Sequence, residues 1–459
     1  MYALISLLVL IISTLLFRRV AGSLSFTRLN MISWIFYFEL VLMSLIGSVI
    51  VIHGWDNHYI LGRVQSDARL NGWMAVQYTM IAMPLGMLLA LHLNGLKSNR
   101  ALFHWYIAQP MCSAVSTRDS YIRLPLYVLS VASLLAVLYT FYVLGEVPIL
   151  AAIAGGDALS LAIARADASL GFSGNVYVRN LFGIMLTPIL AFVSFGYLKQ
   201  TGSLGDRIWF FAMLAASCLI LTYDLSKGPI VTFALGFLFF KILAGGKVSK
   251  SALLAFCGVA FLMLVASYLL VMQVTDPAVL FSLNSGIGGR ILLSQVSGTF
   301  FAFEQFPAVH EFIGFSSLSS FISEAMGIAD SERSAIIMAK IFNPAGAEEG
   351  SPVVMNSLFV AEAWANFGLI GVLIAPIYVG MFIQLVFLLF LRARKTPVLV
   401  GVLAYLSLKL PVTGGINDFI YAPSLATIAF LVVTVYLIAV ILKAGSRNNR
   451  MQRMAPARS

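Results

Sequence analysis

Basic side chains in short polar breaks between long apolar runs carry the first chemical signal in this sequence. In "LTYDLSKGPIVTFALGFLFF", Lys227 follows Asp224 in such a break, and Pro229 suits the first turn of the next helix. Free backbone N–H groups and the positive end of the helix dipole favour an anion there. The spacing therefore predicts that Lys227 binds a phosphate group, with an ion pair to Asp224 as the alternative.

Three arginines lie in other segments outside the apolar runs. Arg165 and Arg179 belong to the stretch 145–180, and Arg290 ends the turn "GIGGR". A guanidinium makes bidentate contacts to phosphate and stays charged at any physiological pH. All three are candidate ligands of an anion, with Asp167 as an orienting partner for Arg165. The alternative for each is a solvated loop charge or a salt bridge, and for Arg179 the anchoring of a helix start.

One carboxylate lies where an apolar run begins. Glu362 in "NSLFVAEAWANFG" has Phe359, Trp364 and Phe367 around it in the sequence. An ionised carboxylate at membrane depth is costly unless it has a partner or a function, and an apolar setting disfavours its charged form. Glu362 is therefore a candidate general acid or base, or else the partner of an arginine. Glu39 is the only other carboxylate well inside an apolar run, and its role stays open.

Further polar residues gather near the end of the chain, where "LSLKLPVTGGINDF" places Lys409, two glycines and Asp418 in the same outer layer. Other chemistries have no support. The sequence holds no nucleophile elbow, phosphate-binding loop, zinc-protease motif or dinucleotide fingerprint. The five histidines lack ligand spacing, so we expect no metal site. His310 is expected to be an ordinary loop residue, with a catalytic role as the alternative. The three cysteines form no CxxC and suggest neither a disulfide framework nor a zinc site.

The composition identifies the elements that must position these residues. Hydrophobic residues make up 60% of the 459 residues and charged residues 10%, with a mean hydropathy of +0.94. Such values are typical of a polytopic membrane protein. We expect an all-α fold in one membrane domain, 1–459, without soluble cofactors. About eleven spans of roughly 20 residues each are predicted, centred near residues 10, 42, 83, 134, 189, 215, 236, 262, 380, 405 and 431.

Charge sets the orientation of these spans. The segments expected on the cytoplasmic side hold 20 of the 29 basic residues and only two acids, Asp119 and Asp206. This asymmetry follows the positive-inside rule and accounts for most of the net charge of +10. Nucleic-acid binding is disfavoured because the basic residues are scattered through short loops. The first run lacks the features of a cleaved signal peptide, so we expect a retained first helix with its amino end outside.

The nine other basic residues lie on the outer side, where the rule discourages them. As a set they predict an outer anion site: Arg63, Arg69, Arg165, Arg179, Lys227, Arg290, Arg333, Lys340 and Lys409. The outer side also holds a large loop, 273–366, whose amphipathic patches predict short interfacial helices, with a re-entrant hairpin as the alternative. Another interfacial helix is expected over residues 157–170.

The order of these segments resembles the oligosaccharide repeat unit polymerases, the O-antigen polymerase (Wzy-type) family. The matching pieces, from about residue 145 to 385, are "GEVPIL", "AR" at Ala164–Arg165, "SKGPI", the large outer loop and "GSPVVMNSLFVAEAWANFGLIGVLIAPIYVG". One departure is that neither Arg165 nor Arg290 is followed by glycine after ten intervening residues, as in some members. Val176 and Phe301 stand there.

The resemblance implies a glycosyltransferase of the bacterial inner membrane. Such enzymes join polyprenyl-diphosphate-linked oligosaccharides into a surface polysaccharide on the outer face, and a chain-length regulator can act as partner. The reaction needs donors for two diphosphates and a group that takes a proton from a hydroxyl. Arg165, Arg179, Arg290 and Lys227 are expected to bind diphosphate, Arg290 also to stabilise the leaving group, and Glu362 to act as base. The alternatives are a flippase for the same lipids and an O-antigen ligase-like transferase.

Overall fold

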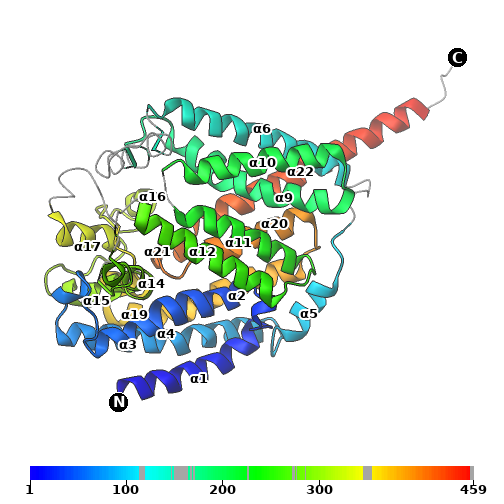
Figure 1. Ribbon diagram of the computed structural model, residues 1–459. Coiled ribbons are helices and arrows are strands. Elements are labelled where there is room, and N and C mark those ends of the chain that lie inside the picture. Colours follow the sequence, from blue (N-terminus) through cyan, green and yellow to red (C-terminus); the bar gives the residue numbers. More distant parts are fainter. Residues whose placement is uncertain are drawn as a thin grey trace. The chain divides into compact units, whose positions relative to one another are not determined.

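A computed structural model gives the arrangement of the chain (Figure 1). It describes residues 1–112, 119–145, 147–148, 164–165, 168, 171–224, 227–270, 274, 276–284, 286–344 and 354–454. All regular elements in these ranges are helices, which confirms the all-α fold. Most of the expected interfacial helix at 157–170 lies outside the described residues, as does Asp167.

Eight of the expected spans are confirmed as helices long and apolar enough to cross a membrane. They cover Tyr2–Val20, Met31–Ile52, Ser66–Leu93, Tyr121–Val143, Val178–Thr201, Leu204–Thr222, Val360–Arg392 and Asn417–Ala444. The other three expected centres fall in shorter apolar helices: Gly228–Leu243, Lys250–Ala266 and Pro397–Lys409. A multi-pass membrane protein is therefore confirmed, while the total of eleven spans stays a prediction.

The helices belong to two compact units. The first unit comprises Met1–Ala108, Lys247–Arg392 and Ser407–Ala422, and the second comprises Gln109–Gly246, Ala393–Leu406 and Pro423–Ser459. The expectation of one membrane domain stays a prediction. Each unit is made of segments that are far apart in the sequence, so each depends on long-range packing.

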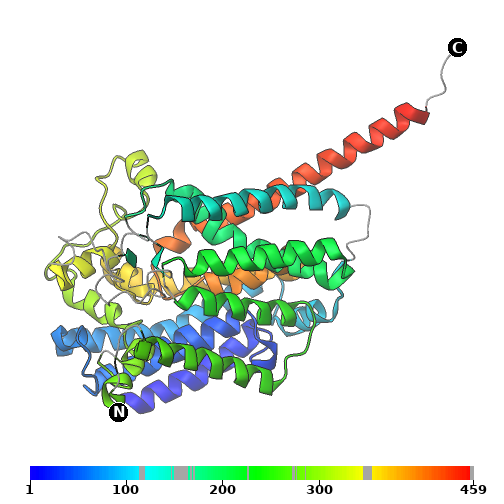
Figure 2. The same cartoon turned by 45° about the horizontal axis from the view of Figure 1, so that its top comes forward.

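In the first unit, α4 (Ser66–Leu93) packs against both α1 (Tyr2–Val20) and α19 (Val360–Arg392) (Figures 1 and 2). The second span is continuous but irregular, because a π-helical stretch, η2, separates two α-helical pieces. Besides the short helices of the large outer loop, this unit contains η1 (Phe26–Arg28), α2 (Met31–Trp34), η2 (Ile35–Leu45), α3 (Ile46–Ile52), η3 (Leu61–Arg63), α5 (Arg100–Ala108), α12 (Lys250–Leu270) and α21 (Asn417–Ile420).

The second unit is a bundle in which α10 packs against α9, while α6 packs against η4 and α22. Its helices are α6 (Asp119–Val143), the π-helix η4 (Val178–Leu186), α9 (Thr187–Thr201), α10 (Leu204–Thr222), α11 (Lys227–Leu243) and α22 (Pro423–Met454). The helix α20 (Pro397–Lys409) crosses the boundary between the units. Arg123 ties α6 to α10 through a bidentate ion pair with Asp206, at 2.9 and 3.3 Å.

In the first unit, the segments predicted to be cytoplasmic lie at one end of the helices, and the segments predicted to be outside lie at the other end. At one end, Asn99 donates to the carbonyls of Arg19 and Val20, and Arg392 donates to Asn94. At the other end, Gln65 N donates to Glu304, and Arg63 donates to the carbonyl of Phe342. The segments expected in the cytoplasm thus meet one another, as do those expected outside.

The described residues of the large outer loop form five short helices between residues 277 and 342. They are α13 (Pro277–Leu280), α14 (Ile287–Leu292), α15 (Ser297–Gln305), α16 (Ser320–Ala325) and α17 (Ser334–Phe342). The amphipathic patch around residues 290–305 is divided between α14 and α15. Short helices are therefore confirmed in this loop, and their position relative to the bilayer stays a prediction.

The long helix α19 is interrupted near its start. Gly368 has φ 58° and ψ −141°, a backbone geometry that side-chain-bearing residues rarely adopt. The carbonyls of Ala365 and Asn366, which the interruption leaves free, accept hydrogen bonds from the backbone N–H groups of Ile313 and Gly314, both at 2.9 Å. At about 1.5 Å per residue, residues 369–392 extend about 36 Å, enough to cross a hydrocarbon layer of ~30 Å. The piece before Gly368 is thus not needed for the crossing.

Candidate functional site

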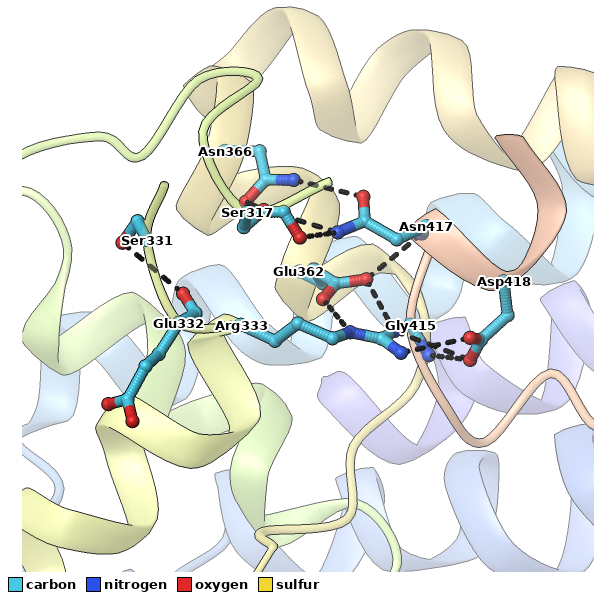
Figure 3. A network of polar contacts seen from close by, with 9 residues as sticks. All are labelled: Ser317, Ser331, Glu332, Arg333, Glu362, Asn366, Gly415, Asn417 and Asp418. Atoms are coloured by element: carbon cyan, nitrogen blue, oxygen red, sulfur yellow. Dashed lines mark hydrogen bonds and ion pairs between the residues drawn. The ribbon is translucent and has the colours of Figure 1, made fainter. Parts of the chain in front are cut away.

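The clearest polar site of the first unit surrounds Arg333, and we call Arg333, Glu362 and Asp418 the acid–arginine cluster. Arg333 caps the start of α17, Glu362 lies in the first turn of α19, and Asp418 lies in α21. Figure 3 shows the guanidinium between the two carboxylates and close to Gly415, while the side chain of Glu332 points away. Three segments distant in the sequence therefore meet at one charged group.

Both carboxylates bind the guanidinium in a bidentate manner. Arg333 Nε and Nη2 donate to Glu362 Oε1 and Oε2 at 2.7 and 3.0 Å. Arg333 Nη1 and Nη2 donate to Asp418 Oδ1 and Oδ2 at 2.9 and 3.3 Å. Paired charged groups of this geometry form strong hydrogen bonds. With one positive and two negative charges, the cluster has a formal charge of −1, so it does not attract a diphosphate.

The members of the cluster differ sharply in exposure. The side chain of Glu362 is 2% exposed, that of Arg333 31% and that of Asp418 48%. Burial opposes the charge of Arg333, but the hydrogen bonds and charges of Glu362 and Asp418 outweigh it and raise the pKa of the guanidinium. Arg333 is therefore permanently charged, and Asp418 is the member that a solute can reach.

Gly415 makes the close packing of the cluster possible. A Cβ atom at this position would overlap Arg333 Nη2 and Glu362 Oε2. The backbone next to it also supplies donors, because Asn417 N donates to Glu362 Oε2 at 3.0 Å and Gly415 N donates to Asp418 Oδ2 at 3.3 Å. The "TGGIND" turn thus serves as a backbone wall of the site.

Buried amides extend the site beyond the charges. Asn417 Nδ2 donates to Ser317 O at 2.8 Å, Asn366 Nδ2 donates to Asn417 Oδ1 at 3.3 Å, and Ser317 Oγ donates to Asn366 Oδ1 at 3.2 Å (Figure 3). All three side chains are buried. A closed network of this kind fixes its members relative to one another. It joins the outer loop, the interrupted start of α19 and α21.

Glu39, whose role the sequence leaves open, anchors the segment that leads into the site. It lies in η2 and accepts hydrogen bonds from the backbone N–H groups of Val412 and Thr413. The carbonyl of Val412 in turn accepts from Phe359 N at 2.9 Å. Glu39 and Glu362 therefore hold the two ends of the segment 412–417.

Two of the predicted diphosphate ligands lie together in the second unit. Arg165 Nε donates to the carbonyl of Asp224 at 3.1 Å, and this arginine is exposed. Arg179 is only 5% exposed, donates to the carbonyl of Ala168 at 2.9 Å, and lies over the rings of Phe172 and Tyr223 at 4.5 and 5.8 Å. The burial of Arg179 favours its anchoring role over contact with a diphosphate, whereas Arg165 is accessible.

The remaining predicted residues occupy separate positions. Arg290 is exposed in α14 of the first unit, outside the acid–arginine cluster. Lys227 is the first residue of α11, and its side chain lies outside the described part of the chain. Among the described residues, no group of three or more His, Cys, Asp or Glu side chains could hold a metal ion.

The sequence does not reveal which arginine Glu362 binds. Arg333 is one of nine outer basic residues, and it is separated from Glu362 by 29 positions and from Asp418 by 85. The available signals were the short outer segment with two glycines and the cost of burying Glu362. The structure agrees with the alternative interpretation, in which Glu362 is the partner of an arginine.

Comparisons with known proteins return no match, since no family model, no curated protein and no solved structure is similar to this chain.

Proposed function

We propose that this protein is a glycosyltransferase that joins polyprenyl-diphosphate-linked oligosaccharides at the outer face of a bacterial inner membrane. The observation that carries the proposal is the acid–arginine cluster, whose Glu362 lies in the part of α19 before the interruption at Gly368. Its carboxylates suit proton transfer with a sugar hydroxyl. The order of sequence motifs, which resembles the O-antigen polymerase family, supports the same reaction.

Cations for the diphosphates are available in both units. The exposed Arg165 and Arg290 are proposed to bind substrate diphosphate, and Lys227 at the start of α11 is proposed to assist them. The donor glycan is already activated by its diphosphate, so the reaction needs no nucleotide and no soluble cofactor. The partners of this proposal are the lipid-linked oligosaccharide, the bilayer and a chain-length regulator.

A flippase for the same lipids is the second candidate. Interrupted helices are common in transporters, where they lie near the middle of the membrane. The interruption in α19 instead follows only a short piece, Val360 to Phe367, and the remaining apolar stretch is long enough to cross by itself. This placement favours chemistry at the membrane surface over transport through its centre.

Deletion of the gene followed by analysis of surface glycan length tests the proposal. We expect single repeat units attached to the lipid core and no long chains. Absence of all attached units would indicate a ligase, and an unchanged ladder of lengths would contradict both transferase functions. In complemented strains, Arg165→Ala and Arg290→Ala should each abolish long chains at normal protein level, and Arg165→Lys should keep partial activity. Lys340→Ala is the control, because Lys340, although one of the nine outer basic residues, pairs with Glu332 at 2.6 Å and is not among the proposed diphosphate ligands.

A further inference from the structure

We propose that Asp418 accepts the proton of the attacking sugar hydroxyl, and that Glu362 and Arg333 are positioning residues that hold Asp418 in place. This inference rests on the proposed function. It moves the role of base from Glu362 to a residue 56 positions further along the chain. Two features of the cluster support the assignment: the access of solutes to Asp418 and the defined position in which the cluster holds it.

Access separates the two carboxylates. Glu362 is 2% exposed and its oxygens accept from Arg333 Nε, Arg333 Nη2 and Asn417 N. A sugar hydroxyl therefore cannot reach it without breaking the site. Asp418 is 48% exposed, and its contacts to Arg333 and Gly415 N include two of 3.3 Å. Asp418 keeps room for a further hydrogen bond to an acceptor hydroxyl.

The cluster also holds Asp418 in a defined position. One edge of the guanidinium is fixed by the buried Glu362, and the rest of it faces Asp418. The backbone of Gly415 and Asn417, anchored through Glu39, forms the wall behind. A base held in this way needs little reorganisation when it receives a proton.

A further polar group lies beside the cluster. Next to Arg333 in the chain, the hydroxyl of Ser334 is buried and has no hydrogen-bond partner among the described residues. Buried hydroxyl groups normally have a partner, so this one retains capacity for a polar ligand.

The proposed step balances without another reactant. The acceptor oxygen forms a bond to the anomeric carbon of the growing chain, and the bond from that carbon to the diphosphate oxygen breaks. The electron pair leaves with the carrier diphosphate, and the hydroxyl proton moves to the carboxylate of Asp418.

The test uses the full-length protein in lipid vesicles and the lipid-linked oligosaccharides extracted from a deletion strain. Asp418→Ala should lower kcat by about 100-fold or more, the usual contribution of a general base, with little change in KM. Added formate, a small carboxylate, can occupy the vacated place beside Arg333. It should raise the kcat of the Asp418→Ala variant by at least about tenfold. Asp418→Glu should keep partial activity.

Controls separate chemistry from folding. Glu332→Ala removes a carboxylate that pairs with Lys340 and points away from the cluster, so it should keep the wild-type rate (Figure 3). Arg333→Ala should also lose activity, and formate should not restore it, because formate replaces a carboxylate and not a guanidinium. If the wild type makes no polymer, the proposed function fails. If the wild type is active and Asp418→Ala keeps its kcat, or loses it without any rescue by formate, the role of Asp418 is wrong.

Discussion

Arg333 and Arg179 show two different ways of stabilising a guanidinium in a mainly apolar protein. In the first unit, two carboxylates neutralise Arg333 and give the cluster a negative charge. In the second unit, Arg179 lies over two aromatic rings and donates hydrogen bonds to a backbone carbonyl and to the side chain of Asn180. The first arrangement places two carboxylates on one guanidinium, and the second packs a guanidinium against aromatic rings in the unit that also holds the exposed Arg165. The same residue type is therefore stabilised in two different ways.

The two arginines should differ most in the stability that is lost when the side chain is replaced by methionine. Arg333→Met leaves Glu362 buried without its ion partner, so we expect a loss of roughly 3–5 kcal/mol in the free energy of unfolding. The double variant Arg333→Met with Glu362→Met removes the unpaired charge and should regain most of that stability. Thermal unfolding in detergent measures both. Equal losses in the single and double variants would mean that the buried charge is not the cause.

Packing around the cluster can be tested without removing a charge. Gly415→Ala places a methyl group where Arg333 and Glu362 lie, and we expect a loss of about 1–3 kcal/mol through forced displacement. Gly62→Ala is the matched control, since no atom lies within 4 Å of its Cβ position. The two melting temperatures should differ clearly. A shift at Gly62 as large as that at Gly415 would show that glycine substitution itself destabilises the protein.

The corresponding truncation in the second unit should be milder. Arg179→Met removes a hydrogen bond to the carbonyl of Ala168 and the contacts with the rings of Phe172 and Tyr223, which are weaker interactions than the two bidentate ion pairs of Arg333. We expect a loss of about 1–2 kcal/mol. The exposed Arg63, which lies over Phe342 at 4.3 Å, provides a control that should lose less. A loss at Arg179 equal to that at Arg333 would remove the distinction between the two arrangements.

Mild acid should lower the stability of the protein through His58, a residue separate from both arginines. Burial lowers the pKa of His58 from 6.5 to about 4, against the opposing charge of Asp56. The unfolded chain then binds more protons than the folded protein between these values, so stability falls as pH drops from 6.5 towards 4 and is unaffected at higher pH. At pH 6 the loss in the free energy of unfolding, relative to neutral pH, is below about 1 kcal/mol.

The variant His58→Asn provides the control for this effect. Its stability should be less sensitive to pH over the range from 7.5 to 5 than that of the wild type. The hydrogen bonds of His58 agree with a neutral ring, since Nδ1 accepts from Ile60 N and Nε2 lies 3.3 Å from Ser294 Oγ. An unchanged pH dependence in the variant would place the titrating group elsewhere.

The sequence by itself determined the class of the protein and the places of its spanning helices. Long apolar runs admit only helices in a bilayer, since every backbone group must find a partner within its own segment. The asymmetric distribution of lysine and arginine likewise predicted which segments meet at each helix end of the first unit. These properties are local or additive, so composition and run length are sufficient to predict them.

Only the tertiary structure decided which charged groups meet. The pairing of Arg333 with Glu362 and Asp418 joins segments up to 85 positions apart, and no local pattern specifies it. The interruption at Gly368 and the π-helical stretches around Glu39 and Arg179 depend in the same way on contacts with distant segments. A buried charge needs a partner, and the sequence predicts that Glu362 has one without specifying which residue it is. The packing of the first unit supplies Arg333 to Glu362 and leaves Asp418 open to solvent.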